Sequence, residues 1–200
     1  NDSLKTVYKE IKYKGFAFPL CLSLNNIAGH YVPTVDNKMI TNNGDLLKIE
    51  IGVHIDGFIG SLCYTTLVTN GVDIENINGN TKRNNALHAV IEASREVYKI
   101  MTPEYSNKDV AQVIRNIATK YGCNLPSYKE RGIIPGIYSY QISQNVIDGK
   151  NEDMDDFVHY LIMPKENPEY NLTLRETQFE EDQVYVIDIL MSRSREIIIE

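Results

Sequence analysis

The stretch of sequence that decides the fold is Leu47–Val68, LKIEIGVHIDGFIGSLCYTTLV. Two apolar-rich runs flank Asp56-Gly57, and an Asp-Gly pair between such runs is typical of a tight β-hairpin. Side chains of a strand alternate between its two faces. In the first run the apolar face holds Leu47, Ile49, Ile51, Val53 and Ile55, and the polar face holds Lys48, Glu50, Gly52, His54 and Asp56. The polar face is the one that can support chemistry.

Counting outward from the turn places Ser61 on the same face as Glu50. A two-residue loop at the turn gives a register that pairs Ile55 with Phe58, Gly52 with Ser61, and Glu50 with Cys63. Two carboxylates at positions 50 and 61 would form a site for divalent cations, whereas one carboxylate and one hydroxyl do not hold a dimetal centre. The alternative for Glu50 is a satisfied sheet residue near Lys48.

Composition sets the class of protein. The chain has 200 residues, 42% hydrophobic and 24% charged, which is typical of one globular domain with its own core. No apolar run has the length of a membrane span. The net charge of −7 argues against a broad nucleic-acid-binding surface, although Lys5–Lys14 is locally basic. Three cysteines, Cys21, Cys63 and Cys123, are expected to be buried free thiols.

Upstream of the hairpin, the spacing of apolar residues predicts the end of an amphipathic helix over Asn1–Lys14. Gly15 and Pro19 then break it. Two short strands are predicted on either side of Asn25-Asn26: Leu20–Leu24 and Gly29–Val32.

Downstream of a loop at Asn70–Asn80, two helices are predicted. The first covers Asn84–Met101, and the second begins at Ser106, where Asp109 nearly completes a capping box, and ends at Gly122. Ile137–Ile147 reads as a short strand or an irregular segment, and Val158–Met163 reads as a strand. The apolar run Val184–Met191 has the pattern of a buried strand. This order predicts an α+β fold with helices on one face of a mainly antiparallel sheet. Because Ile197–Ile199 also reads as a strand, we expect the chain to be a fragment of a longer protein.

Four phrases carry a resemblance to a known family: GFAFPLCLSLNNIAGHYVP (15–33), GDLLKIEIGVHIDGFIGS (44–61), and later NVIDGK and VYVIDIL. They resemble the type II methionine aminopeptidases, and more closely their non-peptidase relatives, the proliferation-associated (ErbB-receptor-binding) proteins. The resemblance implies an α+β pita-bread (creatinase/aminopeptidase-like) fold, an antiparallel curved sheet with helices packed on one face. Residues 1–200 would then be a single, incomplete domain that lacks the family's N-terminal segment, last strands and basic tail.

The resemblance also shows which positions the active aminopeptidases use to hold two metal ions, with two Asp, one His and two Glu. Their first Asp falls on Glu50, and the second falls on Ser61, which cannot bridge two metals. Their metal-binding His falls on Ile137, which has no ligand atom. Their first Glu falls on Asp188, one methylene shorter, and the second lies beyond Glu200. We therefore expect no bound metal and no cofactor, because a lost bridging carboxylate should abolish a two-metal mechanism.

Two further positions belong to the substrate pocket of the aminopeptidases. The substrate-positioning His falls on His30 and is kept, and a second His falls on Asn145. Both are expected to be vestigial, and a structural role is the preferred interpretation of His30. The same structural interpretation is given to His54, His88 and His159. Tyr138 and Tyr140 are expected to pack in the core.

The function expected from this pattern is that of a pseudoenzyme. By resemblance it would be a monomer that binds the ribosome, structured RNA and protein partners, and no membrane. It would act in ribosome biogenesis, translation and growth control in the cytoplasm and nucleus, including the nucleolus. Two alternatives stay open: a methionine aminopeptidase with an altered ligand set, and a pocket that binds a peptide N-terminus without cleaving it.

Overall fold

The computed structural model describes residues 6–37, 39–69, 82–125, 139–146, 161–162 and 176–193. The chain divides into two compact units, which are described separately. The first unit contains Asn1–Ile77 and Ser143–Ile147, and the second contains Asn78–Ile142 and Asp148–Glu200. A single domain over residues 1–200 stays a prediction.

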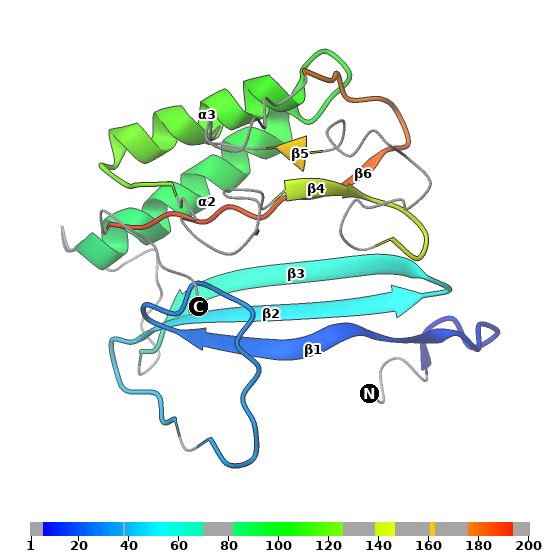
Figure 1. The fold of residues 1–200 in the computed structure, drawn as a ribbon, viewed down its shortest axis with the longest axis horizontal. Coiled ribbons are helices and arrows are strands. Elements are labelled where there is room, and N and C mark those ends of the chain that lie inside the picture. The colour runs from blue at the N-terminus through cyan, green and yellow to red at the C-terminus, as the bar shows by residue number, and fades with distance from the viewer. Residues whose placement is uncertain are drawn as a thin grey trace, which may run out of the picture. The chain divides into compact units, whose positions relative to one another are not determined.

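The first unit is built on the hairpin that the sequence predicts. Strands β2 (Leu46–Ile55) and β3 (Phe58–Leu67) form the hairpin, and β1 (Lys14–Leu24) lies antiparallel on the other side of β2, in the order β1-β2-β3 (Figure 1). Asp56 and Gly57 both have positive φ, 52° and 81°, as a two-residue hairpin turn of the primed type requires. The predicted register is confirmed at every pair: Ile55 with Phe58, Gly52 with Ser61, and Glu50 with Cys63.

The predicted helix over Asn1–Lys14 is wrong for the described part of that segment. Among residues 6–14 only Thr6 is helical, and Lys14 already belongs to β1. Tyr8 has a φ of 49°, in the left-handed region that a right-handed helix cannot contain. The Lys14 ammonium donates to the carbonyl oxygens of Val7 and Tyr8 at 2.8 and 2.9 Å, which holds this turn against the start of the strand.

The two short strands predicted around Asn25-Asn26 are also corrected. The first is the end of the longer strand β1, which continues through Pro19. Proline is tolerated there because β1 is an edge strand and its register with β2 shifts between Phe18 and Cys21. The second, Gly29–Val32, is not a strand; the chain turns back over the sheet instead.

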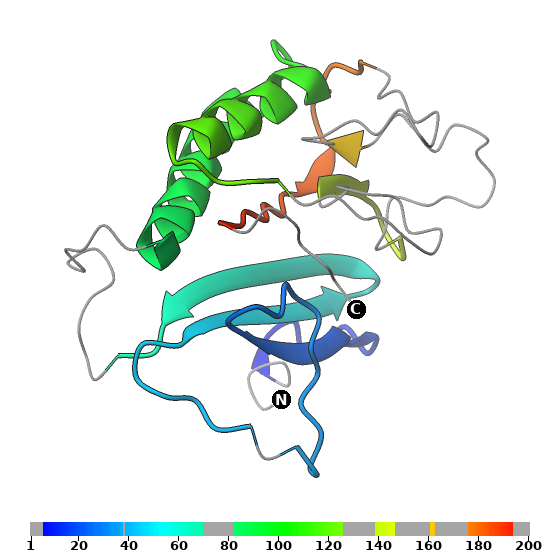
Figure 2. The same cartoon turned by 60° about the vertical axis from the view of Figure 1, so that its left-hand side comes forward.

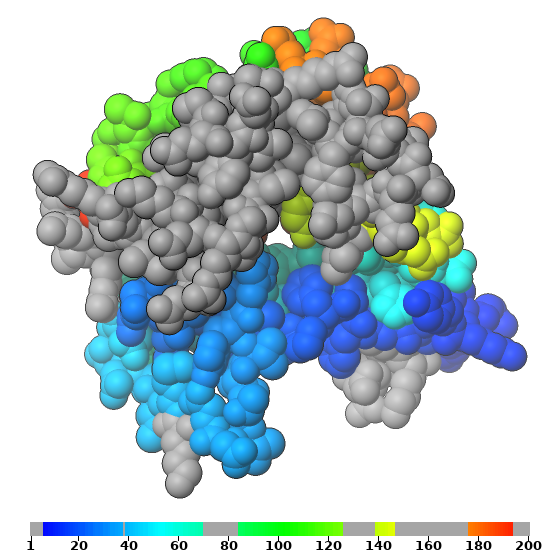
Figure 3. All heavy atoms as spheres, in the orientation of Figure 1, coloured from blue at the N-terminus to red at the C-terminus, as the bar shows by residue number. Residues whose placement is uncertain are grey.

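A long loop connects β1 to β2. Figures 1 and 2 show it extending away from the three strands, and Figure 3 shows its lighter blue atoms standing out from them. Two of its apolar side chains are fully or largely exposed, Val35 and Ile40. Where the loop enters β2, Asp45 accepts from the backbone N–H groups of Asn42 and Val68, which fixes the start of the strand.

The second unit contains the two predicted helices, α2 (Lys82–Ile100) and α3 (Asn107–Lys120), which lie side by side in Figures 1 and 2. Ser106 caps α3 as predicted: its hydroxyl oxygen accepts from the Asp109 N–H, and the Asp109 carboxylate accepts from the Ser106 N–H at 2.8 Å. Gly122, with a φ of 60°, follows the C-cap. The fully buried side chains between the helices include Ala89, Ala93, Val97, Val110 and Ile114.

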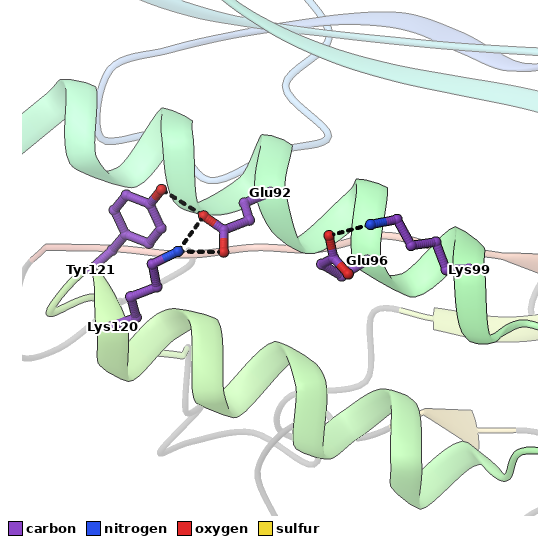
Figure 4. A network of polar contacts seen from close by, with 5 residues as sticks. All are labelled: Glu92, Glu96, Lys99, Lys120 and Tyr121. Atoms are coloured by element: carbon purple, nitrogen blue, oxygen red, sulfur yellow. Dashed lines mark hydrogen bonds and ion pairs between the residues drawn. The ribbon is translucent and has the colours of Figure 1, made fainter.

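A polar network joins the outer sides of the two helices (Figure 4). The Lys120 ammonium lies 2.6 and 2.8 Å from the two carboxylate oxygens of Glu92, and the Tyr121 hydroxyl donates to the same carboxylate at 2.6 Å. These hydrogen bonds, first from Lys120 and then from Tyr121, lower the pKa of Glu92. Their contribution to stability is small because the charged groups reach solvent.

A small antiparallel sheet completes the second unit, with β4 (Ser139–Ile142) between β5 (Leu161–Ile162) and β6 (Val184–Val186). The prediction of a buried strand over Val184–Met191 is wrong in its extent, because only three of its residues are in a strand. The predictions for Asn70–Asn80 and Ile197–Ile199 lie outside the described residues. None of the described helices combines the length and apolar character that crossing a membrane would need.

The hairpin turn gives a direct test of this architecture. Gly57→Ala should lower the free energy of unfolding by about 1–3 kcal/mol, because alanine is strained at a φ of 81° and its Cβ would meet the Asn145 side chain. Gly60→Ala is the matched control, since a Cβ at Gly60 would meet nothing within 4 Å. Urea unfolding measures both variants. Equal stability of the two would contradict the turn described here.

Candidate functional site on the polar face of the hairpin

The polar face of the sheet is covered around Lys48 and Glu50 of β2, whereas Ser61 and Cys63 on the same face of β3 are exposed. Lys48 and Glu50 are 8% and 7% exposed. On the opposite face the large apolar side chains of β3 are open: Phe58 is 61% exposed and Leu62 is 62% exposed. A two-faced antiparallel sheet usually buries its apolar side. The Lys48 and Glu50 side chains are therefore held inside the unit, where they need hydrogen bonds or an opposite charge.

The cover is a segment that follows β1, Asn25–Tyr31, which we call the strap. At its start, the Asn25 carbonyl oxygen accepts from the Lys48 ammonium at 3.0 Å. At its end, the Tyr31 N–H donates to the Ser23 hydroxyl at 3.2 Å, and the Tyr31 carbonyl accepts from the Leu22 N–H at 2.8 Å. Ser23 has no exposed surface. The strap thus runs back over the polar face and is hydrogen-bonded to it.

The centre of the covered face is the carboxylate of Glu50. Its Oε2 accepts from the backbone N–H of His30 at 2.6 Å, and its Oε1 lies 3.3 Å from Nδ1 of the His30 ring. The carboxylate side chain is 10% exposed and the imidazole is 80% exposed. Gly29 passes close to the same carboxylate, since a Cβ at that position would lie 3.3 Å from Oε1. Both oxygens of Glu50 therefore face the strap.

The electrostatics of the face follow from this burial. Burial lowers the pKa of the Lys48 ammonium, and the nearby Cys63 and Glu50 act in the opposite direction. Burial raises the pKa of the Cys21 thiol, and the charge of Glu50 adds to it. The Lys48 ammonium and the Glu50 carboxylate thus partly compensate each other inside the covered face. The prediction that the cysteines are buried holds for Cys21 and Cys123, whereas Cys63 is exposed.

The structure brings together only some of the residues that the sequence singles out. Ser61 lies on the Glu50 face as predicted, but it is exposed. Asn145 has a φ of 63°, and its N–H donates to the Gly57 carbonyl at 2.9 Å, so it contacts the hairpin turn. Asp188 belongs to the second unit, where its N–H donates to the Ser139 hydroxyl at 3.0 Å and its carbonyl oxygen accepts from it. Ile137 lies outside the described residues.

The remaining histidines show no catalytic partner among the contacts of the described residues. The His54 ring lies 4.6 Å from the Tyr13 ring, centroid to centroid, and its Nδ1 is buried without a hydrogen bond. His88 is half-buried on α2, and Tyr140 is half-buried on β4. His159 and Tyr138 lie outside the described residues.

Sequence reasoning missed the residues that close the face: Ser23, Asn25, Gly29 and Tyr31. Their contacts use backbone atoms and small polar side chains, which leave no periodic pattern. The signal that was present is Asn25-Asn26 followed by Gly29, because these residue types favour turns and positive φ. Asn25 indeed has a φ of 50°.

The architecture of an antiparallel α+β chain with this hairpin is that of the pita-bread fold. A solved structure of a thermophilic Arx1 matches 97% of this chain and 52% of that chain with a TM-score of 0.74, at 19% identity. The model of Metallopeptidase family M24 matches residues 2–189 of this chain. The chain belongs to this metallopeptidase family.

Some relatives are named as binding or proliferation-associated proteins, and others are named as methionine aminopeptidases. ERBB-3 binding protein 1 of Arabidopsis thaliana is 32% identical over 96% of this chain and 43% of its own length. Proliferation-associated protein A of Dictyostelium discoideum is 33% identical over 90% of this chain and 41% of its own length. A methionine aminopeptidase of Methanothermus fervidus is 33% identical over 60% of this chain. The chain spans less than half the length of the first two relatives.

A two-metal centre does not fit the donors on the described face. Glu50 is the residue for which the family resemblance implies a ligand position, but both of its oxygens already face His30. Ser61 offers a hydroxyl where a bridging carboxylate would be needed. In the described ranges, no three residues of the types His, Cys, Asp and Glu are grouped so that they could hold a metal ion.

Proposed function

We propose that this protein is a non-catalytic member of the M24 family, a pseudo-aminopeptidase that works by binding other macromolecules. The observation that carries the proposal is the state of Glu50: its carboxylate is buried and hydrogen-bonded to the protein's own strap. A carboxylate used in this way must be released before it can bind a metal. With Ser61 as its partner position, releasing it would still supply only one carboxylate.

The partners proposed are the ribosome or structured RNA, together with proteins. Support comes from the resemblance to the proliferation-associated proteins and from the name of the plant relative, ERBB-3 binding protein 1. We place the nucleic-acid contact on the basic segment, because the chain as a whole carries a charge of −7. Within the described part of that segment Lys9 and Lys12 are exposed. A role in ribosome biogenesis, translation and growth control, a monomeric state, and a cytoplasmic and nucleolar location belong to the same proposal.

The second candidate function is a metal-dependent methionine aminopeptidase with an altered ligand set. Membership of the M24 family and the similarity to a methionine aminopeptidase favour it. It would need Glu50, Asp188 and residues outside this chain to hold at least one metal ion. The two candidates differ in whether the intact protein carries a stoichiometric metal.

Metal content and peptide turnover decide between the two candidates. The intact protein, purified and loaded with manganese, cobalt or zinc and then desalted, is expected to retain no stoichiometric metal and to release no methionine from a short Met-initiated peptide. An active methionine aminopeptidase treated in parallel is the positive control. Retention of about one metal per chain together with peptide turnover would overturn the pseudoenzyme proposal.

Ribosome co-sedimentation tests the binding half of the proposal. The intact protein should co-sediment with ribosomes at low salt and be released as salt rises, because phosphate contacts are electrostatic. Lys9→Glu with Lys12→Glu should weaken this binding. Lys99→Glu with Lys108→Glu is the matched control, with the same change of charge on exposed lysines of the second unit. Binding that is absent, insensitive to salt, or lost equally in both double variants would contradict the proposed surface.

A further inference from the structure

We propose that Glu50 is the residue that keeps the strap closed over the polar face, so that the face opens only when the contact between Glu50 and His30 breaks. The family resemblance assigns this position to an Asp that binds metal, and here it holds a longer side chain. The inference goes beyond the proposed function, because it concerns access to the face and does not depend on what binds there.

The length of the side chain is the first step. Glu50 projects from the middle strand of the three-stranded sheet, and its carboxylate reaches the backbone of the strap at 2.6 Å from the His30 nitrogen. An aspartate would withdraw the carboxylate by about one carbon–carbon bond, roughly 1.5 Å. The His30 nitrogen would then lie roughly 4 Å from the carboxylate, beyond the distance of a hydrogen bond. The extra methylene is therefore what allows this position to bind the strap.

The backbone of the strap is the second step. His30 has a φ of 60°, in the left-handed region that histidine adopts only at a cost. In this conformation its N–H points at the carboxylate, while its ring is left 80% exposed. Gly29 allows the chain to pass the carboxylate closely, because a Cβ there would lie 3.3 and 3.4 Å from the two oxygens. The strained turn persists because the buried carboxylate holds it.

The Ile27 N–H of the strap donates to the Leu24 carbonyl at 2.9 Å, and further hydrogen bonds lie at the two ends of the strap. At the first end, the Asn25 side chain donates to the Asp45 carboxylate and accepts from the Leu46 N–H, both at 3.0 Å. At the second end, Tyr31 is bonded to Leu22 and Ser23. Glu50 meets the strap between these ends, at Gly29-His30. Loss of the Glu50 contact should therefore free the strap locally and leave the strands in place.

Opening of the strap at Gly29-His30 would expose the Glu50 carboxylate, while Lys48 would stay bonded to Asn25 at the first end. The Lys48 ammonium donates to the strap carbonyl of Asn25, and the Glu50 carboxylate accepts from the strap N–H of His30. A ligand of the Glu50 carboxylate must replace the His30 contact, and a ligand of the Lys48 ammonium must replace the Asn25 contact. The strap thus occupies the hydrogen-bonding groups of Glu50 and Lys48, and Glu50 positions the strap.

Hydrogen exchange of the intact protein, followed by mass spectrometry, tests the inference. Glu50→Asp should speed exchange of the strap amides by about tenfold or more, the effect of losing a hydrogen bond to a charged group. Peptides from the interior of β2 and β3 should keep their wild-type exchange. Glu96→Asp is the matched control: Glu96 is a surface carboxylate on α2 paired with Lys99, and its shortening should not affect the strap.

Two further variants separate the parts of the contact. Glu50→Gln keeps the length of the side chain with a neutral acceptor, so strap exchange should lie between those of wild type and Glu50→Asp. His30→Gly keeps the backbone N–H, suits the positive φ and removes the ring, so the strap should stay more protected than in Glu50→Asp. Strap exchange in Glu50→Asp equal to that of the Glu96→Asp control would overturn the proposal. An increase spread evenly over β1, β2 and β3 would also overturn it, because Glu50 would then support the whole sheet and not the strap.

Discussion

The burial of the Glu50 carboxylate is the constraint on which the strap of the first unit depends. An ionised carboxylate removed from water costs several kcal/mol unless charges and hydrogen bonds compensate it. Here the His30 N–H donates to the carboxylate, the nearby Lys48 ammonium supplies the opposite charge, and the Lys48 ammonium in turn donates to Asn25. The strap therefore needs the carboxylate for its conformation, and the carboxylate needs the strap for its burial.

This mutual dependence links the fold to the proposed loss of catalysis. A metal-binding carboxylate must keep its oxygens free for the ion, whereas both oxygens of Glu50 face the strap. The exposed hydroxyl of Ser61 adds no second carboxylate on the same face. The register of this hairpin keeps Glu50 and Ser61 on one face of the sheet. Glu50 uses that position to bind the backbone of the strap. We therefore look for function on surfaces away from this face.

The sequence predicted those parts of the fold that depend on local chemistry. Asp56-Gly57 specified the hairpin and its register, and Ser106 with Asp109 specified the start of α3, because each signal lies within a few residues of the structure it controls. The alternation of β2 showed which side chains share a face, including Glu50 and Ser61. It could not show that the Lys48 and Glu50 side chains are covered by the strap.

The parts that the sequence did not predict depend on contacts between distant segments. Strand β1 continues through Pro19 because β2 pairs with it on both sides of an irregularity, and β6 stops after three residues although its apolar run is longer. The strap is held by Lys48 and Glu50, which lie about twenty residues further along the chain, so no pattern of neighbouring residues predicts it.

Diffraction from crystals of the intact protein tests these contacts directly. Crystals of the intact protein grown with Mn²⁺, with anomalous data collected for that ion, test the central claim most directly: we predict no anomalous peak at Glu50 and the His30 N–H within hydrogen-bond distance of its carboxylate. A manganese ion bound to Glu50, with the strap displaced, would contradict it.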